Sequence, residues 1–239
     1  MLYIFFGEDY YSRQAAFKDF QKSLGDEESI NMNTTFLNAN EANVNEVLAM
    51  IGTVPFLASS RVVVIEGLLS MFEGSKRSEF GQWDQLENVA RTMPDSNHLV
   101  LLDGKIRPSN PMLKVLGKAG YSKEFIPLKG SSLRAWAIRA AKSRGVLIED
   151  DALTLLIDNC GNNLLSLESE IEKLSLYKHH DKIIDLASVK LNVNYERDEN
   201  IFRVIDQVFS RNYNSARLSF QHLLDGGVDS IEFILLLAS

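Results

Sequence analysis

The sequence predicts a mixed fold: an α/β domain with a largely parallel sheet, followed by a region made only of helices. Strand-like and helix-like segments alternate over the first 130 residues, which is the pattern of an α/β layer. Residues 62–65 and 99–102 are apolar at every position, as expected for strands covered on both faces. After Leu128 the strand signals stop and helical periodicity takes over.

In the first region, short apolar or β-branched runs bounded by turn residues mark the strands, and apolar residues spaced three or four apart mark the helices. We expect five strands, at residues 2–7, 33–39, 61–67, 97–104 and 121–128. We expect helices at residues 12–24, 41–52, 78–93 and 110–120.

In the second region, four segments carry an apolar stripe at helical spacing, and the first opens on serines and closes on Gly145. We expect helices at residues 131–145, 149–161, 163–177 and 185–191. They predict a small helical domain over residues 131–197. A polar segment at 192–200 then leads into three more helical segments over residues 198–239, where we expect a further helical domain to be cut short.

Composition restricts the class of protein. The net charge is −7, from 32 acidic against 25 basic residues, which does not favour tight autonomous binding to nucleic acid. The single cysteine, Cys160, excludes an intramolecular disulfide and fits a reducing compartment. Neither a secretory signal nor an apolar run long enough to cross a membrane is visible, so we expect a cytoplasmic protein.

The loop after the first strand lacks the residues of a phosphate-binding site. Such a site needs glycines, a lysine and a following Ser or Thr. Here Gly7 is followed by Glu8 and Asp9, whose charges would repel phosphates. Asp103 ends the fourth strand, but Gly104 follows it where an ATPase would carry a catalytic glutamate, and we interpret Asp103 as a turn residue.

No other catalytic or metal-binding pattern is present in the sequence. His98 and His222 are isolated, and His179 and His180 are neighbours at an expected helix end, which does not make a metal site. There is no Gly-x-Ser-x-Gly elbow. We therefore expect no catalytic, cofactor-binding or metal-binding residues, and a binding function is favoured.

Phe56 and Leu57 stand directly before the third strand, where two interpretations compete. Apolar residues beside a strand usually fold back into the core. However, Pro55 restricts the turn, and no alternating pattern joins Phe56 and Leu57 to the apolar run that starts at Val62. The side chains of Phe56 and Leu57 are therefore either buried in the core or exposed as an apolar surface.

Several segments together resemble one family, the delta subunit of the bacterial DNA polymerase III clamp loader, in that family's order and over essentially the whole chain. They are "YIFFGEDYY", "VPFLASSRVVVIEG", "HLVLLDGKIRPSNPMLKVLGKAG" with "FIPL", "LRAWAIRAAKSRGVLIEDDALTLLIDNCGNNLLSLESEIEKLSLY" and "NIFRVIDQVFSRNYNSARLSFQHLLDGG". The resemblance implies an AAA+-like, RecA-type α/β domain without a nucleotide site at 1–130, a helical lid domain at 131–197, and the truncated start of a helical collar domain at 198–239.

The resemblance also implies a function and a clamp-binding segment. A delta subunit binds the beta sliding clamp through two apolar residues and opens the ring for loading onto primed DNA, without binding or hydrolysing ATP itself. The matching positions here are Pro55, Phe56, Leu57 and Arg61. The aromatic residue comes first in this chain, and Ser59 and Ser60 replace the usual charged pair.

Further partners follow from the same resemblance: the gamma/tau motor subunits, the delta-prime subunit, and primer-template DNA within the DNA polymerase III holoenzyme, which is a nucleotidyltransferase. Basic residues that could contact this DNA are Lys105, Arg107, Arg139, Lys142 and Arg144. They could equally form solvated surface. Two alternative functions stay open, a divergent AAA+ NTPase and a general protein-interaction scaffold.

Overall fold

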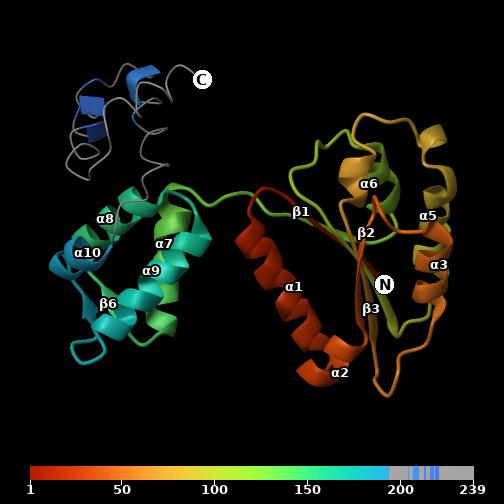
Figure 1. Cartoon of the computed structure of the whole chain (residues 1–239), viewed down its shortest axis with the longest axis horizontal. Coiled ribbons are helices and arrows are strands. Elements are labelled where there is room, and N and C mark those ends of the chain that lie inside the picture. Colours follow the sequence, from red (N-terminus) through yellow and green to blue (C-terminus); the bar gives the residue numbers. More distant parts are fainter. Residues whose placement is uncertain (194–203, 205–206, 210–212, 214–215, 218, 221–239) are drawn as a thin grey trace. The chain divides into compact units, whose positions relative to one another are not determined.

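The computed structural model describes residues 1–193 together with 204, 207–209, 213, 216–217 and 219–220. Within it the chain divides into a compact unit, Met1–Pro127, and a second unit that begins at Leu128 (Figure 1). The collar start expected at 198–239 lies outside the described residues apart from those few positions.

The first unit is built around a parallel five-stranded sheet, as expected from the sequence. All neighbouring strands run parallel, in the order β2-β3-β4-β1-β5. The central strand β4 is buried along its whole length, because both of its faces are covered. The strands are β1 (Leu2–Phe6), β2 (Thr34–Asn38), β3 (Arg61–Glu66), β4 (Asn97–Leu102) and β5 (Tyr121–Glu124).

Helices cover the two faces of this sheet unequally. On one face, α1 (Tyr10–Leu24) packs Phe17 against a core that includes Val62, Val64 and Val100. The alternate strand residues Val63, Ile65, Leu99 and Leu101 belong to a larger core on the opposite face. That face is covered by α3 (Val44–Gly52), α4 (Leu68–Met71), α5 (Leu86–Thr92) and α6 (Pro111–Leu116).

Two short helices were not expected from the sequence, and one expected helix is broken. The unexpected helices, α2 (Glu27–Met32) and α4, are too short to show helical periodicity. The helix expected at 78–93 is divided into the 3₁₀ helices η1 (Arg77–Glu79) and η2 (Gly81–Gln85), followed by α5. Gly81 has a φ of 56°, a left-handed conformation that interrupts a right-handed helix.

The second unit is mainly helical, as expected, with one small addition. Its helices are α7 (Gly130–Ser143), α8 (Asp150–Cys160), α9 (Leu164–Tyr177) and α10 (Leu186–Asn192). The expectation that strands stop after Leu128 is wrong in one detail, since β6 (Leu147–Ile148) pairs in parallel with β7 (Ile183–Ile184). Two-residue strands leave too little pattern to recognise in a sequence. In the described part of the chain, no helix has the length and apolar character that spanning a bilayer requires.

Candidate functional site

Phe56 and Leu57 lie at the surface of the first unit, in the segment that joins α3 to β3. We call residues 53–60 the apolar loop. Phe56 is 66% exposed and Leu57 is 87% exposed, and the neighbouring Val54 is exposed as well. The interpretation in which the pair folds back into the core is therefore excluded, and the loop presents three large apolar side chains to solvent.

Two buried asparagines hold the backbone of the apolar loop. Asn33 accepts a hydrogen bond from the Phe56 N–H (2.6 Å) and donates one to the Phe56 carbonyl (2.9 Å). Asn97, the first residue of β4, donates to the carbonyls of Ile51 (2.6 Å) and Thr53 (3.0 Å). The loop is thus fixed at its start and at its tip. Neither asparagine was expected from the sequence, where the only signal is a position at the start of a predicted strand.

The other two residues predicted for clamp binding are less accessible than Phe56 and Leu57. Pro55 is half-buried. Arg61 is half-buried too and belongs to β3, where its N–H donates to the Ser96 carbonyl. Arg61 Nε is buried and has no hydrogen-bond partner among the described residues. The exposed apolar surface is therefore carried by the loop residues before Arg61.

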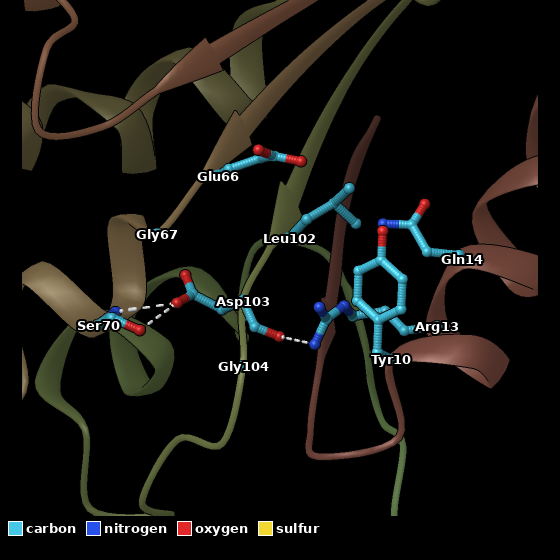
Figure 2. Close-up of a pocket in the computed structure, with 9 residues that line it drawn as sticks. All are labelled: Tyr10, Arg13, Gln14, Glu66, Gly67, Ser70, Leu102, Asp103 and Gly104. Atoms are coloured by element: carbon cyan, nitrogen blue, oxygen red, sulfur yellow. Dashed lines mark hydrogen bonds between the residues drawn. The ribbon is translucent and has the colours of Figure 1, made fainter. Parts of the chain in front are cut away.

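A second feature of the first unit is a pocket at the carboxyl ends of the central strands, which we call the strand-end pocket. In parallel α/β sheets this edge is where ligands usually bind. The pocket has a volume of about 350 Å³ (Figure 2). Its lining residues are Tyr10, Arg13, Gln14, Glu66, Gly67, Ser70, Leu102, Asp103 and Gly104.

The loop after β1 lies beside this pocket, and its backbone donors are used within the protein. Gly7 N–H donates to the Gly104 carbonyl (2.8 Å), and Asp9 N–H to the Phe125 carbonyl (3.0 Å). Ser12 N–H donates to Asp9 Oδ1 (2.9 Å), which caps α1. A phosphate-binding loop instead leaves its N–H groups free for the ligand. This loop is closed by internal hydrogen bonds.

Arg13 occupies the space between the loops that follow β1 and β4. Its guanidinium Nη1 donates to the carbonyls of Gly7 (2.8 Å) and Asp103 (2.5 Å), and Figure 2 shows the bond to Asp103. Burial lowers the pKa of Arg13 below its usual range, opposed by the negative charge of Asp103. The side chain therefore joins the two loops from within the chain.

Asp103 has a structural role that goes beyond the expected turn. Its carboxylate accepts hydrogen bonds from the N–H groups of Leu69 (2.7 Å) and Ser70 (3.2 Å), and from the Ser70 hydroxyl. These bonds hold the start of α4 to the end of β4. Burial raises the pKa of Asp103, and the hydrogen bonds from Ser70 and Leu69 oppose that rise.

The five basic residues proposed as DNA contacts are divided between the two units. In the first unit Lys105 is paired with Glu8, and Arg107 lies 3.6 Å from Glu73. In the second unit Arg144 is paired with Glu168 at 2.8 Å. Arg139 and Lys142 are exposed on α7, and neither has an ion-pair partner in the part of the chain that the structure describes.

The described histidines and the cysteine do not form a site. His98 is buried in β4, where desolvation lowers its pKa. His179 and His180 contact each other after α9, with ring centroids 5.5 Å apart, and His222 lies outside the described residues. Cys160 is buried at the end of α8. No group of three metal-ligating side chains occurs among the residues that the structure describes.

Comparison with known proteins gives a consistent family. Residues 3–125 match the family model of the DNA polymerase III delta subunit. The Bacillus subtilis DNA polymerase III subunit delta is 22% identical over 242 residues, covering all of this chain and 70% of the relative. A probable delta subunit from Aquifex aeolicus is 25% identical over 160 residues, covering 65% of this chain and 46% of the relative.

Solved structures agree on the fold. The Bacillus subtilis DNA clamp loader delta protein matches with a TM-score of 0.68 at 22% identity, over 98% of this chain and 70% of that one. A Thermotoga maritima RuvB variant matches with a TM-score of 0.50 at 13% identity, over 87% of this chain and 69% of that one. The AAA+-like fold expected from the sequence is thus confirmed, and the chain belongs to the delta subunit family of DNA polymerase III.

Proposed function

We propose that this chain binds the beta sliding clamp through the apolar loop and opens the clamp ring for loading onto primed DNA. The observation that carries this proposal is the exposure of Phe56 and Leu57 on a loop whose backbone is held by buried asparagines. Large apolar side chains that remain in solvent on an ordered loop are typical of a protein-binding surface. Membership of the delta subunit family supports the clamp as the partner.

Burial of these two side chains would supply a large part of the free energy of clamp binding. Each contributes about 1.5–3 kcal/mol when it enters an apolar pocket. Ring opening then follows from differential binding. If the loop fits a distorted clamp interface better than the closed one, part of the binding energy shifts the ring toward its open form.

We also propose that the chain does not bind ATP and that the gamma/tau motor subunits supply it within a complex that includes delta-prime. The bonded amides of Gly7, Asp9 and Ser12 support this, as do the guanidinium of Arg13 between the two loops and the Glu8–Lys105 pair beside them. A triphosphate would have to break these contacts and would face the charge of Glu8.

For contact with primer-template DNA in the assembly, Arg139 and Lys142 are the best placed of the five candidates, because both are exposed and unpaired within the described residues.

Calorimetric titration of the purified chain with the beta clamp tests the main proposal. Combining Phe56→Ala with Leu57→Ala is expected to weaken clamp binding at least about 100-fold while the thermal melt stays nearly unchanged. The matched control combines Leu165→Ala with Leu176→Ala, two exposed leucines of α9, and should bind like wild type. Equal clamp affinity in the Phe56/Leu57 variant and wild type would refute the proposal.

Titration with ATP and ADP at millimolar concentration tests the second part. No binding is expected, because the donors that would hold the phosphates are already engaged. Stoichiometric nucleotide binding would instead support the divergent NTPase.

A further inference from the structure

Asn33 connects three separate segments of the first unit through its side chain and backbone. It follows α2 and precedes β2, and only 1% of its surface is exposed. Its amide group donates to the carbonyls of Ser29 and Phe56, both at 2.9 Å. Its own carbonyl accepts a hydrogen bond from the Val62 N–H in β3 (3.0 Å). The residue therefore joins the end of α2, the apolar loop and the start of β3.

The hydrogen bonds from Asn33 satisfy both backbone groups of Phe56. Its Oδ1 accepts from the Phe56 N–H, and its Nδ2 donates to the Phe56 carbonyl. A strand neighbour would supply the same donor and acceptor pair. The side chain thus makes the two hydrogen bonds that a neighbouring strand would make with Phe56, the residue directly before the most exposed residue of the loop.

The conformation of Leu57 shows why the loop needs this support. Leu57 has a φ of 50°, a left-handed conformation that leucine rarely adopts, and its side chain is 87% exposed. An exposed side chain has few contacts with which to hold its own backbone. The backbone of the preceding residue, Phe56, is held on both sides by Asn33.

We propose that Asn33 is a positioning residue for clamp binding. It holds the Phe56 peptide so that Phe56 and Leu57 are already in their binding conformation before they meet the clamp. This inference rests on the proposed function and adds a residue that does not itself need to contact the clamp. A side chain ordered in advance loses less conformational entropy on binding, so the effect of Asn33 is on affinity.

Asn110 provides a matched control in the same unit. It is also 1% exposed and also makes three side-chain hydrogen bonds. It donates to the Leu69 carbonyl (2.7 Å) and to Glu73 (2.9 Å), and it accepts from the Leu113 N–H (3.0 Å). None of these partners belongs to the apolar loop. Removing either asparagine should lower stability similarly, but only Asn33 should change clamp affinity.

The first experiment compares the clamp affinity of Asn33→Ala, Asn110→Ala and wild type under conditions where all three are folded. Asn33→Ala is expected to bind about tenfold more weakly, and Asn110→Ala like wild type. Asn33→Ser is a milder variant. A serine at a helix end can still donate to the carbonyl four residues earlier, here Ser29, but it is too short to hold Phe56. The clamp affinity of Asn33→Ser should therefore fall as far below that of wild type as the affinity of Asn33→Ala does.

The second experiment needs no clamp. Hydrogen exchange of the Phe56 amide should be slow in wild type and should become at least about tenfold faster in Asn33→Ser, because the N–H loses its acceptor. Val63 in the centre of β3 should keep its protection in both proteins. A Phe56 amide that exchanges rapidly in wild type would overturn the proposal.

The outcomes separate this inference from the function on which it rests. Normal clamp binding by the Phe56/Leu57 double alanine variant would refute both. If that double variant loses binding while Asn33→Ser and Asn33→Ala bind like wild type, the apolar loop is the binding site but Asn33 does not position it. If Asn33→Ala and Asn110→Ala lose clamp affinity equally, Asn33 contributes to stability only and does not position the apolar loop.

Discussion

The apolar loop and the strand-end pocket both depend on hydrogen bonds from buried or half-buried polar side chains, but these bonds have opposite results. At the loop, Asn33 and Asn97 bind the backbone and leave apolar side chains in solvent. At the pocket, Arg13 and Asp103 bind the surrounding backbone, so that carbonyl and N–H groups there are paired within the chain. The same kind of interaction leaves apolar side chains exposed in one region and pairs polar groups in the other.

The pocket region keeps the sheet edge at which parallel α/β folds usually bind ligands. Its lining comes from the carboxyl ends of β3 and β4 and from α1. However, the loop after β1 is tied to Gly104 and Phe125 instead of wrapping a phosphate. The apolar loop, for which we propose clamp binding, lies at the opposite, amino-terminal end of β3.

The largest expected effect on stability concerns Gly7, in the loop after β1 beside the strand-end pocket. Gly7 has a φ of 129°, and a Cβ there would overlap the backbone of Phe125, including its carbonyl oxygen. That backbone cannot withdraw easily, because the Phe125 N–H donates to the Phe6 carbonyl (2.7 Å). Gly7→Ala should therefore lower the free energy of unfolding by about 3 kcal/mol or more.

The matched control for Gly7 is Gly104, in the loop to which Gly7 is bonded. A Cβ at Gly104 would meet nothing within 4 Å. Gly104→Ala should change the unfolding free energy by less than about 1 kcal/mol in urea titrations. Equal stability of the two alanine variants would show that the loop after β1 is not closed as described.

A smaller effect is expected from Arg13→Ala, which removes the link between the two pocket loops. Two hydrogen bonds from a charged donor are lost, so the unfolding free energy should fall by about 2 kcal/mol. The control Lys18→Ala removes an exposed cation from the same helix and should stay within about 0.5 kcal/mol of wild type. Clamp affinity should not change in either variant, because the apolar loop is untouched. A loss of clamp binding in Arg13→Ala but not in Lys18→Ala would contradict the claim that the strand-end pocket takes no part in clamp binding.

The smallest effect is a pH dependence that only the pocket should show. Burial raises the pKa of Asp103 in the folded state above its ordinary value near 3.8. The folded state therefore holds this proton more strongly than the unfolded state does, and the contribution to stability is lost as the pH rises through the folded pKa. The stability of wild type relative to Asp103→Asn should fall as the pH is raised from about 4.

Urea unfolding at a series of pH values measures this difference. The same series with Asn33→Ala should give a constant difference from wild type, because no titratable side chain is removed at the loop. A difference for Asp103→Asn that does not vary with pH would contradict the burial of its carboxylate.

The strands of the sheet could be predicted because each one is recognisable from its own short run of residues. Runs such as residues 62–65 and 99–102 are long, wholly apolar and bounded by turn residues, so both their strands and their burial follow from the sequence. α2 and α4 could not be predicted, since six and four residues carry no periodicity. The helix expected at 78–93 is interrupted at one glycine, Gly81, whose positive φ the helical periodicity of the segment does not indicate.

The candidate site was only half predictable, for a related reason. Phe56 and Leu57 stand out in the sequence, but their pattern fits both a core position and a surface position. The contact that accompanies their exposure comes from Asn33, which is 23 residues away in the chain. Arg13 reaches the Asp103 carbonyl across 90 residues. Such pairings follow from the strand order, which no local pattern encodes.

We propose that the apolar loop binds the clamp and that the loop after β1, beside the strand-end pocket, takes no part. Hydrogen exchange of the whole chain, with and without saturating beta clamp, tests both statements together. We predict that the clamp slows exchange at residues 53–60 and leaves residues 7–12 unchanged. Slower exchange at residues 7–12 with no change at residues 53–60 would contradict both.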